Sequence, residues 1–334
     1  MICSRQSTPG EGSWSWLLVA SFFFLPIAVG GQSRSQSTSS LESADVQTTF
    51  SVTTELVQLP VSVTDASGNF VSGLTSQNFR VYEDGKPQRI TLFEREDLPV
   101  TVGLIVDHSR SMGPKLSAVT AAISSFAHSS NPEDEMFVVD FSDRVWPEFF
   151  GGQLFTNDVK ALETALATVT AQGQTALYDA VYEGLERLRL GHREKKALIV
   201  VSDGGDNASR RKYGEVLTLA RQSQAVIYAI GLVGESGQEE NPKILERLCK
   251  DTGGLSFFPG AVEMVTEISV RIAQDLRQQY TVGYAPEKKA SAGAFRKVQV
   301  KVSAPGRGKM QVRTRPGYAA AREKDSPLPS KGPA

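Results

Sequence analysis

The chain has 334 residues, which is more than one typical domain needs and enough to bury a sizeable core. Its 36 Lys and Arg residues are balanced by 37 Asp and Glu residues, so no global charge attracts it to nucleic acid or to an anionic membrane. Hydrophobic residues make up 40% and charged residues 22%, which is the composition of an ordinary globular protein.

The N-terminus carries an apolar run that is typical of a secretory signal peptide. Trp14–Val29 is mostly apolar, and Ala28-Val29-Gly30 forms a small-x-small cleavage pattern. The run is interrupted by Pro26 and is short for a membrane span. We therefore predict a signal peptide over residues 1–30 and an exported protein, located in the periplasm, at the cell surface or in the medium. The alternative is an uncleaved anchor that attaches the protein to a membrane.

The next segments predict a linker and then a β-rich flank. Residues 31–46 are rich in Ser, Thr and Gln, as flexible linkers are. Residues 47–97 form short alternating runs punctuated by Gly, Asn and Asp, which indicates antiparallel strands. The strands expected here are Leu59–Thr64, Phe79–Tyr82 and Ile90–Phe93.

Residues 98–280 alternate between apolar runs and amphipathic stretches, which is the pattern of βαβ units with right-handed crossovers. The expected strands are Val100–Val106, Met136–Phe141, Val145–Phe149, Ala197–Ser202, Ala225–Gly231 and Leu255–Phe258. The expected helices are Ser111–His128, Thr156–Thr168, Thr175–Leu190, Tyr213–Gln222, Pro242–Lys250 and Ala261–Gln278. We predict an α/β fold with a doubly wound, mostly parallel sheet, in which Val145–Phe149 forms an antiparallel hairpin at the edge.

A second β-rich flank, residues 281–320, follows the α/β region. Its expected strands are Tyr280–Tyr284, Phe295–Val302 and Lys309–Thr314. Because neither flank is large enough to bury a core alone, we predict that both pair into one small β-sandwich-like domain. Two separate β ribbons packed on the central region are the alternative. The Pro- and Lys-rich residues 321–334 predict a disordered tail.

The second flank is rich in basic residues. They are expected on the solvated side of edge strands, where they discourage aggregation. A face that binds polyanions is the alternative, but no interleaved aromatic residues support base stacking, so we expect no nucleic-acid partner. The residues concerned are Arg296, Lys297, Lys301, Arg307, Lys309, Arg313 and Arg315.

The most informative motif is Asp107-His108-Ser109-Arg110-Ser111, which directly follows the first strand of the α/β region. A strand that ends in Asp-x-Ser-x-Ser brings a carboxylate and two hydroxyls to the carboxyl edge of the sheet, where open α/β sheets bind ligands. These hard oxygens suit a small divalent cation such as Mg²⁺. Ser and Asp are also common turn formers and helix caps, so the motif alone fits a plain turn equally well.

Two later segments favour the metal site. Ser202-Asp203-Gly204-Gly205 ends a second buried strand, and Gly173-Gln174-Thr175-Ala176-Leu177 is a Gly-bearing loop that opens a helix. With these three motifs in this order, the chain resembles the von Willebrand factor type A domain over residues 98–280. That resemblance implies a metal-ion-dependent adhesion site that binds Mg²⁺, or alternatively Mn²⁺. The implied ligands are Asp107, Ser109, Ser111, Thr175 and Asp203.

The resemblance implies adhesion, because the ion keeps a position for the Asp or Glu carboxylate of a protein partner. The flanks, for example Val81–Pro87 and Arg313–Tyr318, are similar to a bacterial family in which this domain lies between β segments. Two other functions stay open. A metal-dependent hydrolase would use the ion as a Lewis acid with His108 as the candidate base. A structural envelope protein would have no external ligand. We expect no enzyme, and the sequence does not indicate an oligomeric state.

Four further residues lie near these motifs, and three of them have two interpretations each. Asp206 and Asn207 either support the metal loop or cap the helix that begins near Tyr213. His108 either acts at the site or is an ordinary surface residue. Asp143 is expected to have a role in a turn and not as a metal ligand.

Overall fold

The computed structural model describes residues 56–95, 97–232, 241–287, 291 and 293–320. The predicted signal peptide (1–30), the linker (31–46), the start of the first flank (47–55) and the tail (321–334) lie outside these described residues. The described residues belong to one compact unit.

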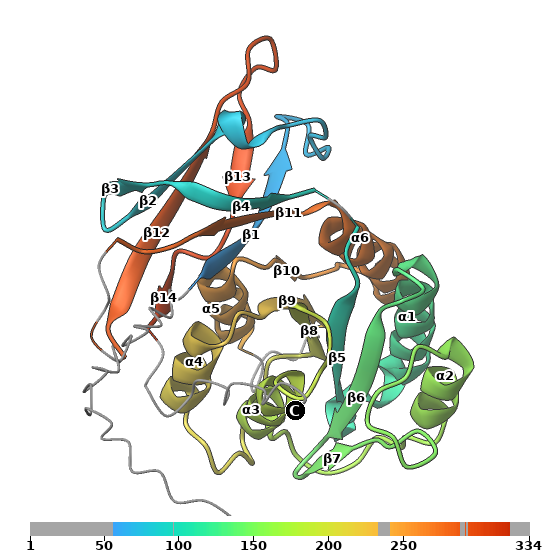
Figure 1. The fold of residues 1–334 in the computed structure, drawn as a ribbon. Helices are drawn as coiled ribbons and strands as arrows, with labels where there is room; N and C mark the ends of the chain where they lie inside the picture. The colour runs from blue at the N-terminus through green and yellow to red at the C-terminus, as the bar shows by residue number, and fades with distance from the viewer. Residues whose placement is uncertain (1–55, 96, 233–240, 288–290, 292, 321–334) are drawn as a thin grey trace, which may run out of the picture. The chain divides into compact units, whose positions relative to one another are not determined.

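The α/β region is built on a six-stranded sheet with the order β10-β9-β8-β5-β6-β7 (Figure 1). Its strands are β5 (Val100–Asp107), β6 (Glu135–Phe141), β7 (Val145–Pro147), β8 (Lys195–Ser202), β9 (Val226–Gly231) and β10 (Ser256–Phe257). Neighbouring strands pair in parallel, except that β7 runs antiparallel to β6. The predicted mostly parallel sheet with an antiparallel edge hairpin is therefore confirmed.

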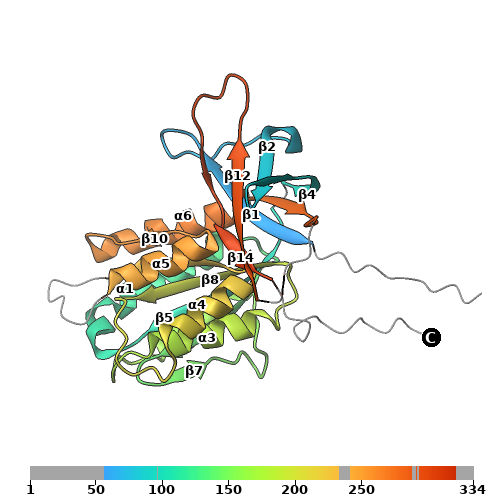
Figure 2. The same cartoon turned by 90° about the vertical axis from the view of Figure 1, so that its left-hand side faces the viewer.

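Helices cover both faces of this sheet. One face carries α1 (Leu116–Ser129), α2 (Val159–Ala167) and α6 (Val265–Gln278). The other carries α3 (Leu177–Leu188), α4 (Tyr213–Gln222) and α5 (Pro242–Thr252), which Figure 2 shows gathered on one side. Within the described ranges, no helix combines the length and the apolar character that crossing a membrane requires.

Four helices begin later than predicted: α2 and α3 by three and two residues, and α1 and α6 because a 3₁₀ turn precedes each. The expected helix from Ser111 starts as a 3₁₀ turn, Arg110–Lys115, and α1 itself begins only at Leu116. Pro114 explains the delay, because proline has no N–H to donate and disfavours the helical conformation of the residue before it. Ser111 therefore lies on a turn at the sheet edge. A second 3₁₀ turn, Val262–Met264, precedes α6.

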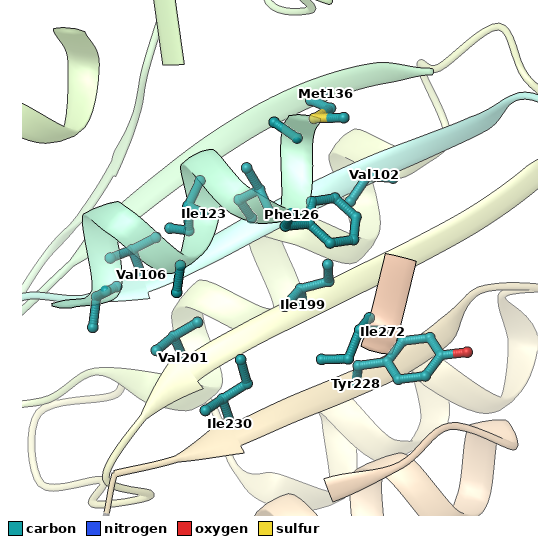
Figure 3. Close-up of a cluster of buried hydrophobic side chains, with 14 of the residues drawn as sticks. Val102, Val106, Ile123, Phe126, Met136, Ile199, Val201, Tyr228, Ile230 and Ile272 are labelled. Carbon is teal, nitrogen blue, oxygen red and sulfur yellow. The ribbon is translucent and has the colours of Figure 1, made fainter. Parts of the chain in front are cut away.

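The core consists of hydrophobic clusters on the two faces of the sheet. All eight residues of β5 are buried, as expected for a central parallel strand. Figure 3 shows Val102 and Val106 of β5 on the face that is covered by Phe126 of α1. On the other face, Gly184 lets α3 approach β5 closely, since an added Cβ would lie 2.6 Å from Ile105 Cδ1. This packing holds the carboxyl end of β5 rigidly in place.

The flanks form two four-stranded sheets, with the orders β13-β1-β11-β4 and β14-β12-β2-β3. Their strands are β1 (Val57–Thr64), β2 (Phe79–Glu83), β3 (Lys86–Gln88), β4 (Ile90–Glu94), β11 (Tyr280–Tyr284), β12 (Phe295–Val302), β13 (Gln311–Arg313) and β14 (Gly317–Ala319). Each sheet combines strands of both flanks, through β1 with β11 and β2 with β12. The two sheets share one hydrophobic cluster, which includes Leu59 and Val81. That they fold as a domain separate from the α/β region stays a prediction.

Two arginines of the second flank are not on a solvated face as expected, since Arg315 is buried and Arg313 is partly buried. The Arg315 side chain is 3% exposed, and its guanidinium donates to the backbone oxygens of Gly317 and Arg221. Arg313 forms an ion pair with Asp275 of α6. Both cations therefore attach the β-strands to the helices of the α/β region, an interaction that strand alternation alone does not reveal.

Candidate metal centre

The carboxyl ends of β5 and β8 lie side by side where the strand order of the sheet reverses. From β5 the chain continues to β6 on one side, whereas β8, β9 and β10 extend the sheet on the other. Open α/β sheets bind ligands at such switch points. Asp107 is the last residue of β5 and Ser202 the last of β8, so two of the three motifs meet at this edge.

Asp107 is fully buried and held by both of its carboxylate oxygens. Oδ1 accepts a 2.8 Å hydrogen bond from the backbone N–H of Ser109, which folds the loop back over the strand end. Oδ2 accepts a 2.6 Å bond from the hydroxyl of Ser202 on the neighbouring strand. The carboxylate thus fixes the Asp-x-Ser-x-Ser loop against the end of β8.

A short chain of side-chain oxygens links the first motif to the second. The hydroxyls of Ser109 and Ser111 lie 3.2 Å apart, and the Ser111 hydroxyl donates to Asp203 Oδ2 at 2.6 Å. Asp203 Oδ1 accepts from the N–H of Gly205, which orients the carboxylate within its own turn. Hydrogen bonds therefore connect four of the five predicted ligands, which are Asp107, Ser109, Ser111 and Asp203.

The loop with Thr175 is attached to both other loops through its backbone. The N–H of Arg110 donates to Gly173 O at 3.4 Å, and Gly173 has φ +73°, a conformation that glycine adopts without strain. On the other side, Thr175 O accepts from the N–H groups of Asn207 and Ala208, each at 3.0 Å. Thr175 is buried, and in the described part of the chain its hydroxyl makes no hydrogen bond to the other four predicted residues.

The electrostatics of this edge favour a bound cation. Burial raises the pKa of Asp107 to about 6, because the ionised carboxylate has lost its contact with water. Hydrogen bonds from Ser202 and Ser109 oppose this shift, and the negative charge of Asp203 adds to it. A nearby positive ion would stabilise the ionised carboxylates of both residues.

The donor set decides which ion fits. Among the described residues, no group of three or more His, Cys, Asp or Glu side chains is arranged to hold a metal ion. A cation at this edge would therefore depend on the hydroxyls of Ser109, Ser111 and Thr175 beside two carboxylates. Such oxygens are hard ligands, which suit Mg²⁺ or Mn²⁺ and not the metals that prefer nitrogen or sulfur.

His108 is not an ordinary surface residue, which was one of the two interpretations of the sequence. It is 5% exposed, and its backbone N–H donates to Phe141 O at 2.8 Å. Its ring contacts Trp146 of β7 in a tilted arrangement, with ring centroids 5.3 Å apart. Burial lowers the pKa of His108, and the charge of Asp143 opposes this effect. Sequence patterns did not indicate the contact with Trp146, because it joins a loop to an edge strand.

Asp206 and Asn207 both support the Thr175 loop and helix α3. Asn207 Oδ1 accepts from the N–H of Thr175 at 2.8 Å. Asp206 Oδ1 accepts from the N–H of Tyr178 in the first turn of α3. The helix that Asp206 caps is thus α3, and the predicted alternative of capping the helix that begins at Tyr213 is wrong.

Asp143 lies in the turn between β6 and β7, as expected. Its Oδ1 accepts from the hydroxyl of Ser142 at 3.1 Å, and the carboxylate lies close to Gly173.

The sequence matches the family model of the von Willebrand factor type A domain over residues 102–269, about half of the chain. A search of curated proteins found no match. Similar solved structures include a von Willebrand factor type A protein from Catenulispora acidiphila, with 13% identity over 75% of this chain and 76% of that chain, and a TM-score of 0.48. Another is BatB from Bacteroides thetaiotaomicron, with 17% identity over 53% of this chain and 98% of that chain, and a TM-score of 0.41.

Proposed function

The chain belongs to the von Willebrand factor type A domain family, and we propose that it binds a divalent cation, Mg²⁺ or Mn²⁺, at the edge formed by β5 and β8. Domains of this family are often adhesion or protein-interaction modules and are generally not enzymes. We further propose that the cation recruits a protein partner by accepting an Asp or Glu carboxylate. The proposed ligands are Asp107, Ser109, Ser111, Thr175 and Asp203.

The observation that supports this proposal most strongly is the chain of oxygens that runs from Ser109 through Ser111 to Asp203. Its members come from the ends of two different strands and lie within 3.2 Å and 2.6 Å of each other. Turn formation alone does not require side chains of separate loops to meet. A common ligand explains why they converge.

The chemistry of the donors favours binding over catalysis. The hydroxyls of Ser109, Ser111 and Thr175 are neutral, so the protein contributes only two negative charges, from Asp107 and Asp203. These charges neutralise a doubly charged ion without making the site negative, and five protein ligands leave one position of an octahedral set for an external carboxylate. The partner class that fits is therefore a protein with an accessible acidic side chain.

Two experiments on the full chain test this function directly. Calorimetric titration with MgCl₂ and MnCl₂ should detect binding that Ser111→Ala weakens and Ser117→Ala leaves unchanged, because Ser117 is exposed on α1 and is not one of the proposed ligands. Affinity capture in Mg²⁺ and in EDTA should identify a partner that is retained only with the metal. The absence of a binding heat with either ion would rule out the proposed site.

The two other functions predict different outcomes. A metal-dependent hydrolase with His108 as its base would lose turnover of phosphate or peptide ester substrates in His108→Ala. The contacts of His108 argue against that role, since its ring is buried against Trp146. A structural envelope protein would have no partner whose capture depends on the chelator.

Export is part of the proposal and depends on the sequence of residues 1–30, which lie outside the described residues. We propose that the mature chain begins near Gly31. The intact mass of the protein recovered outside the cytoplasm tests this, because a mass that includes residues 1–30 would contradict cleavage.

A further inference from the structure

Trp146 is a large aromatic side chain that stays 37% exposed beside the candidate metal centre. It lies on β7, the edge strand of the six-stranded sheet, directly opposite Asp140. Its ring contacts that of His108 in a tilted arrangement, with a centroid distance of 5.3 Å and an interplanar angle of 32°. Because His108 directly follows Asp107, a single residue connects the indole to the loop that carries the proposed ligands.

His108 is fixed in the position where it supports this indole. Its backbone N–H donates to Phe141 O at 2.8 Å, and its backbone carbonyl oxygen accepts from the N–H of Gln172 at 2.9 Å. The ring itself is buried, and its Nδ1 makes no hydrogen bond to the residues that the structure describes. The imidazole therefore supports Trp146 by a tilted ring contact, without a hydrogen bond from its Nδ1 among the described residues.

An exposed tryptophan on a rigid support is the kind of residue that dominates protein interfaces. Tryptophan offers a large contact area at little cost in side-chain entropy and is enriched among the residues that carry most binding energy. The fold gives Trp146 no second aromatic neighbour among the described residues besides His108. The exposed part of Trp146 is available to a ligand.

The charges around this aromatic pair select an acidic partner. Arg110 lies between the two motif serines, and Arg144 lies in the turn that leads into β7. Both are exposed, and neither forms an ion pair within the described ranges. The one exposed carboxylate in the same turn, Asp143, accepts from Ser142. Arg110 and Arg144 therefore offer exposed positive charges to an acidic segment, whereas Glu148, the other carboxylate near Trp146 in sequence, is only partly exposed and acts on buried Asp140.

We propose that His108 and Trp146 form a second subsite of the partner-binding surface, which holds an aromatic or aliphatic side chain adjacent to the partner's acidic residue. This inference depends on the proposed function, because the acidic residue completes the coordination of the cation. The partner is then an acidic protein segment in which Asp or Glu has an apolar neighbour. Arg110 and Arg144 contact the negative charges of the same segment.

A displayed library of random nine-residue peptides tests the subsite, with selection in Mg²⁺ and in EDTA. The proteins compared are the wild-type chain, Trp146→Ala, and Phe295→Ala as a matched control. Phe295 is 42% exposed and lies over Arg221, on β12 of a different sheet. Calorimetric titration with MgCl₂ on each variant shows that the metal centre is intact.

In Mg²⁺, the wild-type chain and Phe295→Ala should enrich peptides with an Asp or Glu next to an aromatic or aliphatic residue. Trp146→Ala should bind Mg²⁺ normally and still enrich acidic peptides, but without the apolar neighbour. A synthetic peptide from the selection should bind Trp146→Ala about three- to tenfold more weakly, as expected for the loss of one aromatic contact.

Two other outcomes separate this inference from the proposed function. Acidic peptides without a preferred apolar neighbour, or an unchanged preference in Trp146→Ala, would overturn the subsite and leave metal-dependent binding in place. No enrichment of acidic peptides in Mg²⁺ over EDTA would overturn both.

Discussion

Ser111 and Asp203 are 92 positions apart in the chain, and the Ser111 hydroxyl donates a 2.6 Å hydrogen bond to Asp203 Oδ2. One residue lies on the turn after β5, and the other follows the end of β8. The bond joins the two strands at the switch point of the sheet. Both oxygens are also proposed ligands, and the neutral Ser111 hydroxyl would offer a lone pair to a bound cation while keeping its proton.

Asp203→Asn should weaken Mg²⁺ binding by about tenfold or more, because affinity for hard cations depends on the number of charged ligands. The amide keeps an oxygen that accepts from Ser111, so the fold should be unchanged. Calorimetric titration measures the effect. Asp143→Asn is the matched control, since it removes an exposed carboxylate from a neighbouring turn. Equal affinities for the two variants would contradict the role of Asp203.

Asn207→Ala should weaken Mg²⁺ binding by roughly tenfold, the low end of the effect seen when a group that orients a ligand is removed. The lost side chain accepts the N–H of Thr175, which is buried, so the loop would lose its support. Asn207→Asp keeps an acceptor oxygen at this position and should retain the wild-type affinity. If Ala and Asp at position 207 gave the same affinity, Asn207 would have no such role.

The sequence predicted the α/β region well, because its signals are local. The buried run of β5 and the Asp-x-Ser-x-Ser motif after it indicate a strand end with oxygen ligands without any knowledge of the neighbours. The register of parallel strands then brings Asp203 to the same edge. The approach of the Ser111 hydroxyl to Asp203 follows from that register.

One feature that the sequence analysis missed is local: Pro114 delays the start of α1, although the amphipathic pattern around it continues. The other missed features depend on long-range packing. Arg315 is buried because its guanidinium donates to backbone oxygens of α4 and β14. The alternation of residues along a β-strand does not predict such partners. The contact of His108 with Trp146 depends on the position of the edge hairpin relative to the loop after β5. Each of these contacts joins segments whose relative position is set only by the complete fold.

Asp140→Asn should stabilise the protein at pH 8, with a gain that disappears as the pH falls towards 4. Asp140 is 2% exposed on β6, and neither carboxylate oxygen has a hydrogen-bond partner among the described residues. Burial raises its pKa to about 8, and the charge of Glu148 adds to the shift. The folded state thus binds a proton that the unfolded state, with a pKa of about 3.9, releases. Wild-type stability therefore decreases as the pH rises between these values.

The gain from Asp140→Asn at pH 8 should be on the order of a few kcal/mol, because each pKa unit corresponds to about 1.4 kcal/mol. Urea unfolding at a series of pH values measures it. Glu133→Gln provides the control, since Glu133 is exposed in the turn before β6. A difference between wild type and Asp140→Asn that did not depend on pH would show that Asp140 stays ionised.

Asp275→Asn should destabilise the protein by about 3 kcal/mol, because the change leaves the charge of Arg313 without its buried partner. Asp275 is 2% exposed on α6 and also accepts from the hydroxyls of Ser62, at 2.9 Å, and Tyr228, at 2.6 Å. The cost should lie at the low end for a buried pair, since the Arg313 side chain is 23% exposed. Guanidinium unfolding measures this cost. The control is Asp97→Asn, which removes the more exposed partner of Arg277 on the same helix and should cost less than about 1 kcal/mol. Similar costs for the two variants would mean that the contact between α6 and β13 contributes no more than a surface ion pair.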